Sequence, residues 1–180
     1  KAHGTTLIGP GCAGVIIPEV CKVGAHPVRF FKNGSVGIVS KSGALSYEIG
    51  KTLTDNGIGQ SGVVAIGGGP VWGFSQRDAI ALYAQDPDTK VIVLLGEIGG
   101  GSEEAAAAYI KTHVNKPVVS LIVGRNAPTG KSLGHAGAIV NGNVGTAATK
   151  IAALEDAGVH VVKNPVELVA QIRALLKKEG

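Results

Sequence analysis

The chain has 180 residues, of which 44% are hydrophobic and 17% charged, and its formal net charge is +4 at pH 7. This length allows one domain with a large buried core, and the composition excludes intrinsic disorder and a charge-rich coiled coil. Because the basic residues form no run and no apolar run approaches the roughly 18 residues of a membrane span, we expect neither nucleic acid nor a membrane as a partner.

The first 34 residues are interrupted repeatedly by Gly and Pro and contain one apolar stretch, Gly14–Ile17. We therefore expect a lead-in segment over 1–34 and one domain over 35–180. Cys12 and Cys21 lack a CxxC spacing, which is typical of reduced thiols in the cytoplasm or, in a eukaryote, the mitochondrial matrix; the alternative is one disulfide between them. The chain contains no Met, and we expect it to be a piece whose upstream sequence is missing.

From residue 35 onward, short runs of β-branched residues alternate with helical patterns of about 10–15 residues, which is typical of βαβ units. Five such runs predict strands over residues 36–39, 63–66, 91–95, 118–122 and 159–162. They show no alternation of polar and apolar residues, as expected for parallel strands covered on both faces. The sequence therefore predicts an α/β fold with a doubly wound, five-stranded parallel sheet and helices on both faces.

Helical patterns fill the gaps between these strands, over residues 43–55, 75–85, 102–114, 146–157 and 164–178. Ser75 and Ser102 are expected to cap the N-termini of the second and third helices. In the second helix, the spacing predicts that Ile80 and Leu82 are buried.

The strand-to-helix turns are the candidate sites, because ligands of doubly wound sheets bind at the carboxyl ends of the strands. The first turn contains Ser40 and Ser42 and opens a helix at Gly43. Its backbone N–H groups and the helix dipole predict a site for a phosphate or carboxylate. The alternative is that Ser42 only caps the helix. The GxxxxGK[ST] pattern of a Walker A loop is absent from this turn.

Two later segments carry groups capable of chemistry. Glu97 ends an apolar strand among glycines, where a carboxylate needs a partner, and His135 lies among small residues that leave an imidazole accessible. Histidine can accept a phosphoryl group covalently, and a carboxylate on one ring nitrogen makes the other nucleophilic. Because both residues follow strands of the same sheet, we expect Glu97 to orient His135. The alternative for Glu97 is a carboxylate that accepts only local backbone hydrogen bonds.

The turn over residues 67–73 contains three consecutive glycines followed by Pro70, with Trp72 two residues further on. Glycines there allow the backbone to approach a ligand closely, and the alternative is an irregular loop in which Trp72 simply packs. No group of His, Cys, Asp and Glu has the spacing of metal ligands, so we expect no metal.

An ordered set of short motifs spans nearly all 180 residues. In chain order the set includes Gly37-Ile38-Val39-Ser40-Lys41-Ser42-Gly43, Tyr47-Glu48, Gly96-Glu97-Ile98-Gly99-Gly100, Lys116-Pro117-Val118-Val119, Gly134-His135-Ala136-Gly137-Ala138-Ile139 and Lys150-Ile151-Ala152-Ala153-Leu154. Together these motifs resemble the alpha subunits of the succinate–CoA ligase family, within the wider superfamily of NDP-forming acid–CoA ligases.

The resemblance implies a flavodoxin-like CoA-ligase domain that relays phosphate between an acyl phosphate and a nucleotide. It implies that His135 is the phosphohistidine nucleophile and that Glu97 holds the imidazole in place. It also implies that Ser40, Ser42 and Gly43 bind phosphate, and Tyr47 matches a position that contacts substrate.

The resemblance further implies an ATP-grasp beta subunit as partner, which would bind Mg-ATP or Mg-GTP. The substrates it implies are a small carboxylic acid and phosphate. CoA is expected to bind mostly to an N-terminal CoA-binding Rossmann domain, which is absent from this chain.

Two departures from the family leave the identity of the acid open. Gly69 stands where the family usually has Asp, and residues 11–13 replace a common Asn-x-Pro. Malate–CoA ligase and citryl-CoA synthetase small subunits and ATP-citrate lyase therefore remain alternatives. A non-catalytic module that binds CoA or phosphate, or that serves assembly, is another. A flavodoxin-like electron carrier is disfavoured, because the chain has few aromatic residues for a flavin site.

Overall fold

The computed structural model describes residues 3–126, 134–140 and 145–178. Within these residues the chain forms a mixed sheet of seven strands, together with five α-helices and a short 3₁₀ helix, η1 (Val28–Phe30). In the same part of the chain, no helix is long and apolar enough to cross a membrane.

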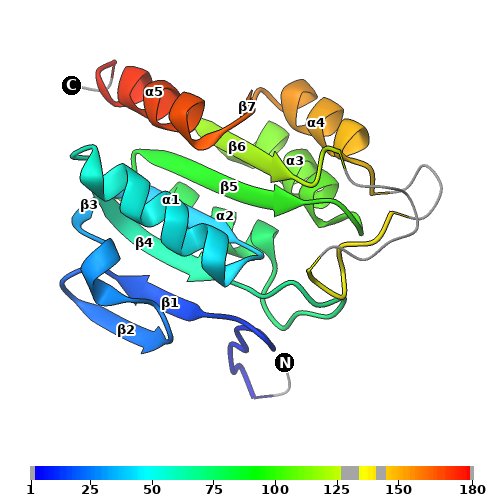
Figure 1. The fold of residues 1–180 in the computed structure, drawn as a ribbon, viewed down its shortest axis with the longest axis horizontal. Coiled ribbons are helices and arrows are strands. Elements are labelled where there is room, and N and C mark those ends of the chain that lie inside the picture. Colours follow the sequence, from blue (N-terminus) through cyan, green and yellow to red (C-terminus); the bar gives the residue numbers. More distant parts are fainter. Residues whose placement is uncertain (1–2, 127–133, 141–144, 179–180) are drawn as a thin grey trace.

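Parallel strands make up most of the sheet and reach one of its edges (Figure 1). Their order is β4 (Gln60–Ala65), β3 (Asn33–Ser40), β5 (Val91–Glu97), β6 (Val118–Val123) and β7 (His160–Val162). When these strands are numbered along the chain, their order is the 2-1-3-4-5 order of flavodoxin-like folds. The predicted fold class is therefore confirmed, including its doubly wound set of five parallel strands.

The lead-in residues extend this sheet at one edge, which the sequence did not predict. β1 (Gly14–Ile17) pairs antiparallel with β4, and β2 (Cys21–Gly24) pairs antiparallel with β1. Both strands are only four residues long, and every residue of β2 is exposed. Such short runs without alternating burial carry no recognisable strand period. The division of the chain at residue 34 stays a prediction.

Helices cover both faces of the sheet (Figure 1). Buried residues of α1 (Gly43–Asp55) and α5 (Pro165–Leu176) belong to the hydrophobic core on one face. Buried residues of α2 (Gln76–Gln85), α3 (Ser102–His113) and α4 (Ala147–Asp156) belong to the core on the other. The strands between the two cores are apolar on both sides, as the sequence predicted for them.

The predicted burial of Leu82 is wrong, since this side chain is 61% exposed. The buried face of α2 is formed by Ala79, Ile80 and Tyr83. Leu82 follows Ile80 by two positions, which places it about 200° further around the helix axis. The hydrophobic side chain therefore points away from the core that holds Ile80.

The two predicted serine caps have different outcomes. Ser75 caps α2 as predicted, because its hydroxyl accepts a hydrogen bond from the backbone N–H of Asp78 at 3.2 Å. Ser102 does not cap α3: the N-cap residue is Gly101, and Ser102 is the first helical residue. The Ser102 hydroxyl instead donates to Oε2 of the neighbouring Glu103 at 3.1 Å.

The order of the strands reverses between β3 and β5, which are adjacent and parallel. The helix after β3, α1, lies on one face of the sheet, and the helix after β5, α3, lies on the other. In doubly wound folds this divergence opens a crevice at the carboxyl ends of the two strands. The turn after Ser40 and the turn after Glu97 both lie at this crevice.

Candidate functional site

The start of α1 is a tightly hydrogen-bonded turn. Ser42 is the N-cap residue, and its hydroxyl accepts from the backbone N–H of Leu45 at 3.2 Å. The hydroxyl of the fully buried Ser40 accepts from the N–H of Ser42 at 3.0 Å and donates to the Ser42 carbonyl at 2.8 Å. Ser40 therefore shapes the turn from beneath, and Ser42 caps the helix while also facing the crevice.

Glu97 and His135 meet at the carboxyl end of β5. Nδ1 of His135 lies 2.6 Å from Oε2 of Glu97, and the two residues are 38 positions apart in the chain. The carboxylate is 8% exposed and the imidazole 32% exposed, so the acid lies beneath a partly accessible ring. A carboxylate at Nδ1 favours the tautomer with its proton on Nδ1, which makes Nε2 the basic and nucleophilic nitrogen.

The glycine turn after β4 supports His135 from another side. A methyl group added at Gly68 would lie 2.2 Å from Cγ and Nδ1 of the His135 ring. The carbonyl of Gly68 also accepts a hydrogen bond from the N–H of Gly137 at 3.0 Å. The turn over 67–73 thus packs against the histidine segment. Trp72 closes this turn by donating from its indole nitrogen to the Gly67 carbonyl at 2.7 Å.

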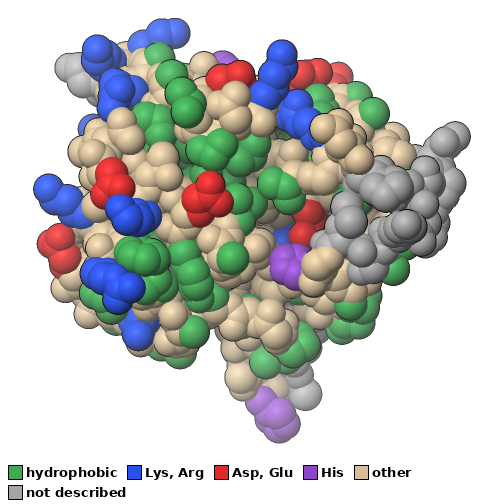
Figure 2. Space-filling view, in the orientation of Figure 1, with side chains coloured by type: hydrophobic (Ala, Val, Ile, Leu, Met, Phe, Trp, Pro, Cys, Tyr) green, Lys and Arg blue, Asp and Glu red, His purple; other side chains and the backbone are tan. Residues whose placement is uncertain are grey.

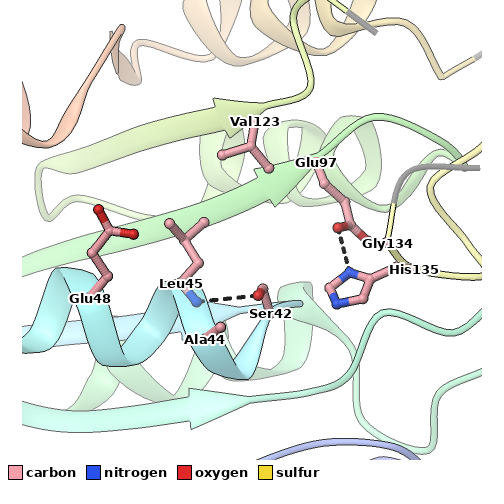
Figure 3. A pocket seen from close by; sticks show the side chains of 8 residues that line it. All are labelled: Ser42, Ala44, Leu45, Glu48, Glu97, Val123, Gly134 and His135. Carbon is pink, nitrogen blue, oxygen red and sulfur yellow. Dashed lines mark hydrogen bonds and ion pairs between the residues drawn. The ribbon is translucent and has the colours of Figure 1, made fainter. Parts of the chain in front are cut away.

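Ser42, Glu97 and His135 line one cavity of about 380 Å³ beside the start of α1 (Figure 3). In Figure 3 the imidazole lies below the Glu97 carboxylate and beside Ser42 at the start of α1. The other residues that line this cavity are Ala44, Leu45, Glu48, Val123 and Gly134. The space-filling view shows a histidine beside an acidic side chain at a hollow of the surface, with Lys and Arg spread over several elements (Figure 2).

A second cavity of about 680 Å³ adjoins the first and shares Leu45, Glu48 and Val123 with it. It extends from the carboxyl end of β6 to the start of α5, where Arg125 and Lys163 contribute to its wall.

Three of the predicted site residues do not line the cavity: Ser40, which lies beneath the turn, Gly43 and Tyr47. Gly43 begins α1, and a methyl group there would lie 3.1 Å from Cβ of Ala13. Tyr47 is half-buried, its hydroxyl is 3.5 Å from the Ala25 carbonyl, and its ring packs edge-on against His26. The structure thus brings Ser42, Glu97 and His135 together, whereas Gly43 and Tyr47 face the lead-in residues. Residues 130–133, which precede the His135 motif, lie outside the described residues.

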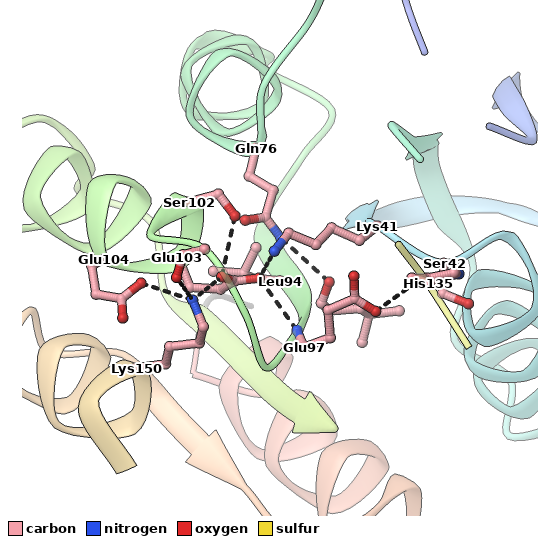
Figure 4. Close-up of polar contacts among 12 residues, drawn as sticks. Lys41, Ser42, Gln76, Leu94, Glu97, Ser102, Glu103, Glu104, His135 and Lys150 are labelled. Carbon is pink, nitrogen blue, oxygen red and sulfur yellow. Dashed lines mark hydrogen bonds and ion pairs between the residues drawn. The ribbon is translucent and has the colours of Figure 1, made fainter. Parts of the chain in front are cut away.

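Sequence reasoning missed a cluster of buried charges behind Glu97 (Figure 4). Glu103 is fully buried and forms ion pairs with Lys41 at 2.8 Å and with Lys150 at 2.5 Å. Burial alone would raise the pKa of the Glu103 carboxyl, but the charges of Lys41 and Lys150 outweigh this effect and hold the pKa below its usual range. Glu103 is therefore an anion at neutral pH.

One signal in the sequence points to this cluster. Lys150 precedes the fully buried Leu154 by four positions, so both lie on the same face of α4. A lysine on the apolar face of a helix needs a buried anion as partner. Glu103 and Glu104 lie in the first turn of α3, where acids interact favourably with the helix dipole, so their position alone does not reveal the buried lysine partner.

The arrangement can support nucleophilic or general-base chemistry at His135, next to a helix N-terminus suited to an anion. Among residues 3–126, 134–140 and 145–178, no group of three or more His, Cys, Asp or Glu residues could hold a metal ion.

Comparison with known proteins shows which family this chain resembles. The sequence pattern of the CoA-ligase family matches residues 39–160, which include the start of α1, Glu97 and His135. The alpha subunit of succinate–CoA ligase [ADP-forming] from Aquifex aeolicus is 50% identical over 171 residues, which is 95% of this chain and 56% of that protein. Alpha subunit 1 of the same enzyme from Archaeoglobus fulgidus is also 50% identical, over 95% of this chain and 58% of that protein. The chain thus spans somewhat less than three fifths of these relatives.

Solved structures agree with the sequence comparison. An ATP citrate lyase from Methanothrix soehngenii, in complex with citrate and coenzyme A, superimposes with a TM-score of 0.85 and 30% sequence identity. The match covers 96% of this chain and 30% of that chain. A dinucleotide-forming acetyl-coenzyme A synthetase from Ca. Korarchaeum cryptofilum, 22% identical with a TM-score of 0.76, shares the fold.

Proposed function

Because the chain belongs to the CoA-ligase family, we propose that it carries the phosphohistidine of an NDP-forming acid–CoA ligase. In the assembled enzyme, succinate, CoA and a nucleoside triphosphate would give succinyl-CoA, the diphosphate and phosphate, a reaction of the tricarboxylic acid cycle. The chain would carry phosphate between the acyl phosphate and the nucleotide. The observation that carries this proposal is the 2.6 Å contact between Nδ1 of His135 and Glu97.

In the direction of nucleotide synthesis, phosphate first displaces CoA from succinyl-CoA and gives succinyl phosphate. Nε2 of His135 then attacks the phosphorus, so a P–N bond forms and the P–O bond to the acyl group breaks. The electron pair of that bond leaves with the succinate carboxylate. The ring gains positive charge, which the Glu97 carboxylate stabilises through the proton on Nδ1.

The second transfer restores the histidine. A terminal oxygen of the nucleoside diphosphate attacks the same phosphorus, and the P–N bond breaks with its electron pair returning to Nε2. Glu97 needs no proton transfer in either step, because Nδ1 keeps its proton throughout. The same steps in reverse phosphorylate His135 from the triphosphate.

The first turn of α1 is suited to hold the transferred phosphoryl group. The first N–H groups of a helix have no partner within the helix, and here Ser42 already accepts from Leu45. We expect the N–H groups of Gly43 and Ala44 to bind the phosphate oxygens, with the helix dipole favouring their charge. Ser40 supports this turn by its hydrogen bonds to Ser42. Tyr47 would reach substrate only from the side of the lead-in residues.

The remaining parts of the enzyme lie outside this chain. An ATP-grasp beta subunit would bind Mg-ATP or Mg-GTP and receive the phosphoryl group, and a CoA-binding domain would hold most of the CoA. The name of the Aquifex aeolicus relative as an alpha subunit supports a partner subunit. We propose that the complex works in the cytoplasm or the mitochondrial matrix.

Succinate is the acid favoured by the comparisons. The succinate–CoA ligase subunits are 50% identical to this chain, whereas the ATP citrate lyase bound to citrate and coenzyme A is 30% identical. Citrate and malate are the competing acids. They are distinguished by measuring CoA-thioester formation with each acid in turn.

The test uses the full-length protein assembled with its partner subunit. The complex is incubated with Mg-ATP or Mg-GTP, and mass spectrometry locates an acid-labile, alkali-stable phosphate. We expect it on the peptide that contains His135. The matched control is His135→Asn, which keeps a polar side chain of similar size and should abolish the phosphate while the complex still assembles.

Phosphate on His135 that is lost in His135→Asn would support the phosphoryl relay. An assembled complex without phosphate on this peptide would instead indicate a non-catalytic binding or assembly module. Full turnover by His135→Asn would contradict the mechanism.

A further inference from the structure

Glu103 contacts two parts of the site that lie far apart in the sequence. Its Oε1 accepts a hydrogen bond from the backbone N–H of Glu97 at 3.3 Å and lies 2.8 Å from Nζ of Lys41. Glu97 ends β5 and carries the carboxylate that holds His135, whereas Lys41 lies in the turn between β3 and α1. One carboxylate oxygen therefore joins the two sides of the crevice.

The other side of Glu103 is fixed as well. Its Oε2 lies 2.5 Å from Nζ of Lys150, which also donates to the Gly100 carbonyl at 2.8 Å, in the loop that follows Glu97. Beneath it, a methyl group at Gly96 would lie 2.7 Å from Cγ of Glu103, so the side chain packs directly on the end of β5. Figure 4 shows this chain of contacts running from Lys150 through Glu103 to Lys41 and Glu97.

Lys41 is held in a defined direction too. Its side chain is 3% exposed, and its Nζ lies 5.4 Å from the centre of the Trp72 ring, within cation–π distance. Ser42, the next residue, caps α1 and lines the cavity with His135. The ion pair of Lys41 therefore lies directly beside the first turn of α1.

Stability alone does not explain a buried ion pair, because well-packed apolar residues of similar volume often stabilise the folded state at least as much. It does fix the relative position of the groups that it joins. We propose that Lys41 and Glu103 are a positioning pair, which sets the distance between the phosphate-binding turn of α1 and the Glu97–His135 couple. This inference rests on the proposed function, since its measured consequence is the rate of phosphorylation of His135.

The test compares variants of the full-length protein assembled with its partner subunit. Lys41→Met removes the cation but keeps an unbranched side chain, and Lys41→Arg restores a cation that can reach Glu103. The readouts are the rate constant for phosphorylation of His135 at saturating Mg-nucleotide, the KM for that nucleotide, and the melting temperature. We expect Lys41→Met to lower the rate constant about 10- to 100-fold, the scale of a misplacement of about 1 Å.

The KM for nucleotide should stay within about twofold in Lys41→Met, because the nucleotide binds to the partner. Lys41→Arg should recover most of the rate. A matched control is Glu104→Gln, which also loses a contact with Lys150, of 2.9 Å, but lies at the partly exposed edge of the cluster. Its rate should equal that of the unmodified enzyme. If Lys41→Met does not assemble, Glu103→Gln applies the same test from the other side of the pair.

A rate unchanged in both Lys41→Met and Glu103→Gln, with or without a lower melting temperature, would show that the pair is only structural and would overturn this inference. An equal loss of rate in Glu104→Gln would overturn it as well. If the unmodified enzyme carries no phosphate on His135, the proposed function itself fails. These two failures are distinguishable, because the first leaves phosphorylation of the unmodified enzyme intact.

Discussion

Gly68 lies directly against the imidazole of His135, and a methyl group at this position would be 2.2 Å from the ring atoms Cγ and Nδ1. This contact is closer than any Cβ allows, so a side chain at Gly68 must displace either the ring or the turn. The same ring edge holds the hydrogen bond to Glu97. The glycine therefore determines whether His135 and Glu97 remain together.

Gly68→Ala should accordingly separate His135 from Glu97 and lower the phosphorylation rate of His135 by about 100-fold. The matched control is Gly69→Ala, where the nearest described atom, the Val71 carbonyl oxygen, would be 4.0 Å from the added carbon. We expect Gly69→Ala to retain the rate. Quantifying phosphohistidine after rapid quenching tests both variants, and equal rates in the two would contradict the role of Gly68.

Glu97→Gln keeps the size of the side chain but removes the negative charge beside the ring. The amide oxygen can still accept from Nδ1, so the tautomer is retained in part, but the charge on the phosphorylated ring is no longer neutralised. We expect phosphorylation to slow by about 100-fold or more, with an unchanged melting temperature of the complex. Single-turnover kinetics measures this, and a rate equal to that of the unmodified enzyme would exclude Glu97 as the orienting group.

Ser42 can be tested by separating its capping role from its place in the cavity. Asp and Asn both cap helices about as well as Ser, so Ser42→Asp and Ser42→Asn should leave the unfolding free energy within about 1 kcal/mol. The Asp carboxylate would repel an incoming phosphate, whereas the neutral amide would not. We expect Ser42→Asp to phosphorylate more slowly than Ser42→Asn. Equal rates would argue against phosphate binding at this turn.

The buried Glu103 predicts how stability depends on pH. Its pKa is lowered from the ordinary value of 4.5 in the folded chain, so its stabilising effect is fully present above about pH 4.5. That effect is lost as the pH falls through the lower pKa of the folded state. Glu103→Gln should lower the unfolding free energy by about 3–5 kcal/mol at pH 7, and the difference from the unmodified chain should shrink below pH 4.5.

Urea unfolding of the 180-residue chain at pH 7, 5 and 3.5 measures this difference. Glu104→Gln is the control, because its partly exposed pair with Lys150 should contribute no more than about 1 kcal/mol. A difference for Glu103→Gln that stays constant from pH 7 to pH 3.5 would contradict the account of the buried ion pair.

Local patterns predicted the elements of this fold well, for a physical reason. The β-branched runs that form β3, β5 and β6 are covered on both faces, so their composition alone identifies them. The ends of helices depend on neighbouring residues. Ser42 and Ser75 each cap a helix by accepting a hydrogen bond from a backbone N–H only three positions further along the chain. The hairpin of β1 and β2 escaped prediction, because its stability comes from pairing with β4 and not from its own sequence.

By itself, the sequence determined the α/β class, most element boundaries and the candidate residues at the strand ends, since each of these follows from interactions within a few residues. Only the tertiary structure decided which candidates meet. Glu97 reaches His135 across 38 positions, and Glu103 reaches Lys150 across 47. Such contacts depend on the order and register of strands and on how helices pack over them, which no short stretch of sequence specifies.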